Sequence, residues 1–135
     1  MRAILLFAPL LLFAACSTPA AEAKKAPAGV AWRQLGTWSG RGNVQTESFT
    51  SDTGTLRVRW TTTAETGKHD AAAPSFRLSA HSAISGRLLQ PVVEHAGAGE
   101  GIGYVQQDPH VMYMVVESND MAWKVTVEEA VSVSF

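Results

Sequence analysis

The histidines are considered first, because histidine is the most common metal ligand and general base in proteins. The chain has four, and they lie far apart at His69, His81, His95 and His110. None has the H-x-H or H-E-x-x-H spacing of a metal site, and the single cysteine, Cys16, lies far upstream. We therefore expect scattered surface histidines, no bound metal and no cofactor.

Nucleophilic and acid–base motifs are also absent from the sequence. Ser39 lacks the G-x-S-x-G pattern of a nucleophile elbow. Glu128 and Glu129 are adjacent, and neighbouring side chains on a strand point to opposite faces, so they do not form a catalytic carboxylate pair. The glycine-rich residues 97–103 match neither G-x-G-x-x-G nor a Walker motif, and we interpret them as a flexible loop or bulge. We expect no enzyme; a hydrolase with an unrecognised site is the least favoured function.

Cys16 is the one residue whose surroundings indicate a definite chemistry. Residues 3–13 form an apolar run that is too short for a transmembrane helix but matches the core of a signal peptide. The segment LFAAC at residues 12–16 resembles the lipobox of bacterial lipoproteins, with Phe13 where leucine is usual. The resemblance implies that residues 1–15 are removed as a signal peptide and that Cys16 is the lipid attachment residue.

The lipid anchor has an alternative, which is an ordinary secretory signal. Ala21-Glu22-Ala23 has the small-x-small pattern of a signal peptidase site, and cleavage there would give a soluble secreted or periplasmic protein. We favour lipidation because the only cysteine directly follows the apolar run. By the same resemblance, an aspartate after the cysteine would signal inner-membrane retention. Ser17 stands there instead, so we expect the outer membrane if the cell has one.

Length and composition limit the folded part of the chain. The 135 residues are enough for one domain. The net charge of -1 comes without any basic stripe, so a nucleic-acid partner is not expected. Residues 16–31 are rich in Ala, Pro, Lys, Ser and Glu, which is typical of a flexible tether. The folded domain is therefore expected at residues 32–135.

From residue 32 onward, apolar and polar residues alternate with the period of two that is typical of strands. The alternation is clearest over residues 56–61, 76–81 and 123–128, and it places one face on a core and the other in water. Residues 110–117 are apolar on both faces, which indicates a central strand covered on both sides or a strand with one face at an interface. The full set of expected strands comprises residues 46–50, 56–61, 76–81, 88–93, 102–106, 110–117 and 123–128.

Turn residues separate these strands. They lie at 51–54, 85–86, 108–109 and 119–120. About seven short strands predict an all-β fold, an antiparallel β-sandwich that is jelly-roll-like. Trp60, Tyr113 and Trp123 are expected to be the large residues of its core.

The C-terminal third carries a second resemblance. Residues 113–118, a short turn and residues 123–128 resemble the closing hairpin of bacterial pre-peptidase C-terminal-like and related jelly-roll modules. The resemblance covers about residues 46–129, and it carries no ligand-binding residue over to this chain. It implies a non-catalytic accessory module of a secreted bacterial protein, of the kind that in some cases binds carbohydrate or protein.

The tryptophans provide the remaining candidates for a binding site. Trp60 and Trp123 alternate with polar neighbours and are interpreted as core. Trp32 and Trp38 precede the first expected strand, where they either cover an open end of the sandwich or form a platform for stacking sugars. The expected function is a lipid-anchored envelope protein, held at the membrane by its anchor, with a non-catalytic binding domain. The alternatives are a carbohydrate-binding module and a structural accessory of an envelope protein complex, for which residues 110–117 are the only indication.

Overall fold

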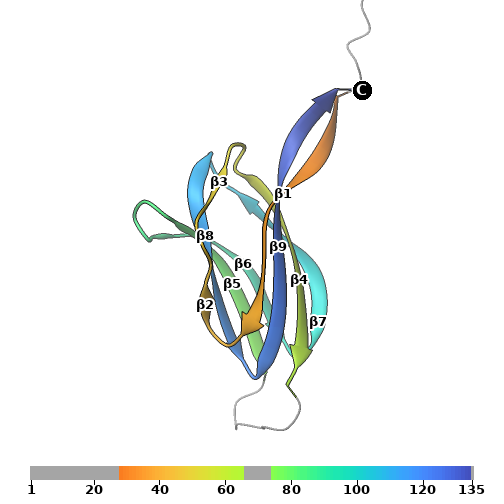
Figure 1. The fold of residues 1–135 in the computed structure, drawn as a ribbon, viewed down its shortest axis with the longest axis vertical. Helices are drawn as coiled ribbons and strands as arrows, with labels where there is room; N and C mark the ends of the chain where they lie inside the picture. Colours follow the sequence, from red (N-terminus) through yellow and green to blue (C-terminus); the bar gives the residue numbers. More distant parts are fainter. Residues whose placement is uncertain (1–27, 66–73, 135) are drawn as a thin grey trace, which may run out of the picture.

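The structure, a computed structural model, describes residues 28–65 and 74–134. In these residues two antiparallel sheets pack face to face, and Figure 1 shows the two layers. The strands are β1 (Ala28–Arg41), β2 (Val44–Gln45), β3 (Phe49–Ser51), β4 (Thr55–Ala64), β5 (Ser75–Ser82), β6 (Leu88–Ala96), β7 (Gly99–Gln106), β8 (His110–Asn119) and β9 (Met121–Ser134). The part of the chain described here contains no helix that is long and apolar enough to cross a membrane.

The strand order identifies the type of sandwich. One sheet has the order β1-β9-β4-β7, and the other has the order β2-β8-β5-β6 with β3 also paired to β8. Because β2 and β3 both pair antiparallel with β8, they are two halves of one interrupted strand. With β2 and β3 counted as one strand, the order of the strands in the two sheets is that of an eight-stranded jelly roll. The all-β, jelly-roll-like sandwich expected from the sequence is confirmed.

The interruption at Thr46 accounts for part of the difference between about seven expected strands and the nine found in the described residues. The Thr46 amide donates to the carbonyl of Met114 at 2.9 Å. The Met114 amide donates in turn to the Thr46 hydroxyl at 2.9 Å, so a side chain replaces a backbone carbonyl in the ladder. The expected strand 46–50 therefore overlaps only β3, and β2 lies just before it.

Strand β1 is the other difference, and a β-bulge explains why its sequence does not alternate. Gln34 pairs with Glu128 and Gly36 pairs with Val127, so Leu35 is an extra residue on β1. A bulge reverses which residues face the core on either side of it, and the period of two is lost across it. The alternation rule therefore does not detect this strand.

The folded structure begins earlier in the chain than we expected, at the start of β1. Residues 28–31 were expected in the tether, but they pair with residues 131–134 of β9. The partner strand supplies the backbone hydrogen bonds that these residues cannot make alone. In Figure 1 the beginning of β1 and the end of β9 leave the body of the sandwich together as a two-stranded ribbon.

The core lies between the two sheets. Trp60 and Trp123 are buried in it, as the sequence predicts. The placement of Tyr113 in the core is wrong, because on β8 it alternates with Met112 and Met114, and these two methionines are fully buried. Tyr113 lies on the outer face of the sheet. β8 is a central strand, as expected, but only one of its faces is covered within the described residues.

Most of the glycine-rich residues 97–103 belong to a strand, and not to the loop or bulge that we expected. Gly101 and Gly103 of β7 meet side chains of the neighbouring strand β4 and of β6 in the other sheet, respectively. A Cβ atom at Gly101 would lie 2.8 Å from the Trp60 ring, and one at Gly103 would lie 2.7 Å from a Val92 methyl carbon. The glycines therefore make room for neighbouring side chains, a use that composition does not distinguish from loop flexibility.

Candidate binding face

Several residues named from the sequence lie outside the described part of the chain. They are the expected lipid attachment residue Cys16, Ser17 after it, and His69. Among the described residues, no group of three or more His, Cys, Asp or Glu side chains is placed to hold a metal ion.

The two tryptophans proposed as a platform do not share a face. Trp38 follows the bulge and packs against the core, with its ring centre 5.8 Å from that of Phe49. Trp32 precedes the bulge and pairs with Ala130, which points to the outside of the sheet. Only Trp32 is therefore placed on the outer face of the β1-β9-β4-β7 sheet.

On this outer face, Trp32 is held by an arginine from another strand. The guanidinium carbon of Arg57 lies 4.4 Å from the centre of the Trp32 ring, which is a cation–π contact. Arg57 belongs to β4, so its side chain reaches across β9 to the ring on β1. Its side chain is only 16% exposed although it points outward. The ring and the guanidinium therefore hold each other in place.

Glu128 fixes two arginines at once. Its carboxylate accepts a hydrogen bond from Arg57 Nε at 2.7 Å, and Arg59 Nε lies 3.3 Å from the same oxygen. Glu128 is 14% exposed, whereas Arg59 is 56% exposed. Arg57 is thus a partly covered support, and Arg59 presents its guanidinium to solvent from a position set by Glu128.

Strand β7 adds two exposed apolar side chains beside the arginines. Tyr104 pairs with Arg57, and Ile102 pairs with Arg59. They are among the most exposed large hydrophobic residues described, at 57% for Tyr104 and 51% for Ile102. We call the surface made by Trp32, Arg57, Arg59, Ile102, Tyr104 and Glu128 the basic-aromatic face.

The basic-aromatic face adjoins a shallow hollow of about 600 Å³. The backbone of the paired residues Trp60 and Gly101 forms its floor. Its rim is made by the four flanking outward residues, Arg59, Thr61, Glu100 and Ile102. A small ligand can therefore rest beside the exposed guanidinium of Arg59 and the aliphatic side chain of Ile102.

The neighbouring carboxylate, Glu129, points the opposite way and has a different role. It is fully buried between the sheets. Its carboxylate accepts hydrogen bonds from the Ser51 hydroxyl at 3.0 Å and the Asp52 amide at 2.9 Å. Arg33, which is half exposed and pairs with Glu129 across the sheet, donates to its other oxygen. Glu129 thus ties β1 and β9 to the turn between β3 and β4.

Two opposing effects set the charge state of Glu129. Burial alone raises the pKa of its carboxyl group, because it removes water from the charged form. The hydrogen bonds from Arg33, Ser51 and the Asp52 amide together outweigh burial and lower the pKa below its ordinary value of 4.5. Glu129 is therefore an ionised, fully partnered structural residue.

A serine–histidine pair occurs on the outer face of the other sheet. The Ser79 hydroxyl lies 3.0 Å from His81 Nε2, and His81 Nδ1 lies 3.3 Å from the Gly86 carbonyl. A carbonyl only accepts, so in the neutral imidazole Nδ1 carries the proton and Nε2 accepts from Ser79. Ser79 lies on β5, an inner strand that pairs with β6 and β8. The β5–β6 ladder shifts register beside Ser79, which lies opposite Pro91.

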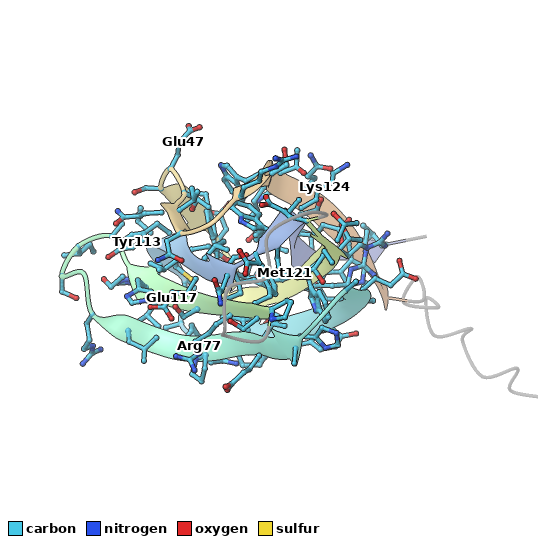
Figure 2. All side chains as sticks on the ribbon, turned by 90° about the horizontal axis from the view of Figure 1, so that it is seen from below. Glu47, Arg77, Tyr113, Glu117, Met121 and Lys124 are labelled. Atoms are coloured by element: carbon cyan, nitrogen blue, oxygen red, sulfur yellow. The ribbon has the colours of Figure 1, made fainter. Side chains whose placement is uncertain are left out.

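A second hollow, of about 620 Å³, lies at one end of this sheet beside Arg77, Glu94 and Glu117. Arg77 is paired with Glu94 at 3.2 Å and with Glu117 at 3.5 Å. Its charge is therefore matched by two carboxylates. In Figure 2, Arg77 and Lys124 lie on opposite outer sides of the sandwich, with Met121 between them.

Sequence reasoning missed most of the basic-aromatic face, although one signal for it was present. Arg57 and Arg59 are two apart on a strand, so they share one face, and Glu128 occupies the polar face of its own strand. What the sequence does not show is that β9 pairs with both β1 and β4 and thereby brings these faces together. No protein-family model, curated protein or solved structure matches the chain.

Proposed function

We propose that this protein is a lipid-anchored envelope protein whose sandwich binds a ligand through the basic-aromatic face and does not transform it. The observation that carries the proposal is the fixed unit formed by Trp32, Arg57 and Glu128 on an outward sheet surface. Preorganised aromatic and guanidinium groups are typical of binding sites, because little conformational freedom remains to be lost when the ligand binds.

The anchoring half of the proposal rests on Cys16 and the apolar run before it. Acyl chains on Cys16 would hold the protein durably, since each buried methylene contributes about 0.8 kcal/mol. β1 begins at Ala28, so the expected tether joins the sandwich on the same strand that carries Trp32. If the cell has an outer membrane, Ser17 favours that membrane as the destination.

Intact mass spectrometry tests the anchor. We expect a mature chain that starts at Cys16 with added acyl mass, released from membranes by detergent and not by high salt, because salt screens charges without weakening acyl burial. Cys16→Ala removes the only thiol that can accept the lipid. An unmodified wild-type chain that starts at Lys24 would contradict the anchor and support the secretory alternative.

The structural-accessory alternative has one supporting observation, on the other sheet. The outward side chains of β8, Val111, Tyr113 and Val115, are only half-buried in the described residues. Ile84 and Leu88 are also exposed large hydrophobic residues. A partner protein bound there would depend on Tyr113 and not on the basic-aromatic face.

Co-sedimentation with the detergent-insoluble envelope fraction tests the binding half. Mature protein in detergent is compared with Trp32→Ala, Arg59→Gln and the opposite-face control Arg77→Gln. We expect the two basic-aromatic variants to bind about tenfold more weakly, which corresponds to about 1.4 kcal/mol, and the control to bind like wild type. Equal binding of all four proteins would contradict this use of the face. So would a result in which a fifth protein, Tyr113→Ala, is the only variant that loses binding.

A further inference from the structure

We propose that the ligand of the basic-aromatic face is an acidic glycan, that is, a sugar chain bearing carboxylates. This inference rests on the proposed function and names its ligand class. It follows from three properties of the face, which are its guanidinium donors, its fixed aromatic ring, and the polar character of the side chains around them.

The guanidinium donors are the first property. Each guanidinium carries five N–H groups, and Arg57 and Arg59 each direct only Nε at Glu128. Their terminal nitrogens donate to no other described residue. Lys124, on the same face, forms no ion pair within the described part of the chain. Guanidinium groups bind carboxylates with two parallel hydrogen bonds, so the unused donors of the exposed Arg59 favour an acidic ligand.

The fixed ring is the second property. Arg57 lies 4.4 Å from the centre of the Trp32 ring and restrains it. An aromatic ring packs well against the apolar C–H face of a sugar, and a ring that is already restrained loses little freedom on binding. Tyr104 provides another exposed aromatic side chain beside Arg57. The face thus combines stacking with carboxylate recognition.

The surrounding side chains are the third property, and they favour a glycan over a protein partner. A protein interface of standard size covers about 800 Å² per partner, with an apolar centre. Here most neighbours of the basic-aromatic face carry hydroxyl or amide groups, namely Gln34, Thr37, Ser39, Thr61, Gln106 and Thr126, and Glu100 on the rim of the hollow carries a carboxylate. Such groups hydrogen-bond sugar hydroxyls. The hollow of about 600 Å³ also lies in the size range of small-ligand sites.

Two polymers that differ only in their carboxylates test the inference. Polygalacturonate is the acidic probe, and its fully methyl-esterified form is the neutral one. Calorimetric titration of the mature protein in detergent should show affinity for the acid about tenfold higher than for the ester, and it should fall as salt rises. Two other anions without carboxylates are tested separately, namely dextran sulfate and vesicles that contain an anionic lipid without a carboxylate. Both should bind more weakly than polygalacturonate.

Variants separate the two kinds of contact. Arg59→Gln should lower the affinity for polygalacturonate about tenfold and leave the weak binding of the ester unchanged. Arg59→Lys keeps the charge but not the paired donors, and it should restore only part of the affinity. Trp32→Ala should weaken the binding of both polymers, and Arg77→Gln should weaken the binding of neither. Each variant is first shown by denaturant unfolding to fold like wild type.

Failure of the inference is distinguishable from failure of the proposed function. If the protein binds polygalacturonate and its methyl ester with equal affinity, the inference of a carboxylate-bearing glycan is overturned. It is also overturned if dextran sulfate or the anionic vesicles bind as tightly as polygalacturonate. Absence of binding to either polymer overturns it too. In each case, face-dependent co-sedimentation with the envelope fraction would leave the proposed function standing. If co-sedimentation itself does not depend on Trp32 and Arg59, both fail.

Discussion

Arg57 and Trp32 are in contact although strand β9 lies between the strands that carry them. On β9, Ala130 lies opposite Trp32 and Glu128 lies opposite Arg57. Glu128 fixes the Nε end of the same guanidinium. Three strands therefore contribute to one rigid unit on the surface.

The first prediction is an energetic coupling between these two residues. In a double-mutant cycle of Trp32→Ala and Arg57→Ala, we expect an interaction free energy of about 0.5–1 kcal/mol, the range for a partly exposed cation–π pair. Denaturant unfolding of the four proteins measures it. If the losses of unfolding free energy in the two single variants add up to the loss in the double variant, the ring and the guanidinium do not support each other.

Glu129→Gln is expected to destabilise the domain by about 1.5–3 kcal/mol, the contribution of one hydrogen bond to a charged group. The amide retains one acceptor oxygen but cannot accept from Ser51, Asp52 and Arg33 together as the carboxylate does. Glu117→Gln, at an exposed ion pair, is the matched control and should cost less than about 0.5 kcal/mol. Similar losses for the two variants would argue against the structural role of Glu129.

The lowered pKa of Glu129 predicts an acid sensitivity. A carboxyl group whose pKa is lower in the folded state stabilises the fold above its unfolded pKa, and this stabilisation is lost as the pH falls through the folded pKa. Unfolding free energies of wild type should therefore fall as the pH drops below about 4.5, and those of Glu129→Gln should fall less steeply. Parallel pH profiles for both proteins would contradict the assignment.

Gly54 and Gly97 form a matched pair for testing steric strain. Both have positive φ, 73° and 78°, so alanine costs each about 1–2 kcal/mol in backbone strain. A Cβ at Gly54 would lie 1.8 Å from the Gln107 carbonyl oxygen, whereas one at Gly97 meets nothing within 4 Å. We expect the midpoint of thermal unfolding to fall clearly further for Gly54→Ala. Equal shifts would mean that the turn between β3 and β4 can move away from Gln107.

Most of the fold could be predicted because the period of two persists in most strands. Residues 56–61, 76–81 and 123–128 lie within β4, β5 and β9, and each predicted turn covers a junction between consecutive strands, although Ser51 and Asn119 are the last residues of β3 and β8. The failures have local causes. The extra residue Leu35 reverses the faces of β1, and buried Met112 and Met114 displace Tyr113 to the outer surface.

The candidate site was less predictable, because it depends on pairings between distant strands. Trp32 is a site residue that its sequence position suggested, but its partners on β4 and β9 become visible only in the sheet order. The sequence groups Trp38 with Trp32 because both precede the first expected strand, whereas the bulge places Trp38 against the core. The alternation over residues 123–128 places Glu129 in phase with the core-facing residues, but its partners in the β3–β4 turn and on β1 become visible only in the structure.

Whether a ligand binds over Trp32 can be observed in the indole N–H resonances of the four tryptophans. Trp38 and Trp123 lie in or against the core and do not line the hollow, so they act as internal controls. On titration with polygalacturonate or solubilised envelope polymer, we expect the Trp32 resonance to shift saturably while those of Trp38 and Trp123 stay in place. A ligand that binds without moving the Trp32 resonance, or that moves those of Trp38 and Trp123 instead, would contradict the basic-aromatic face as the binding site.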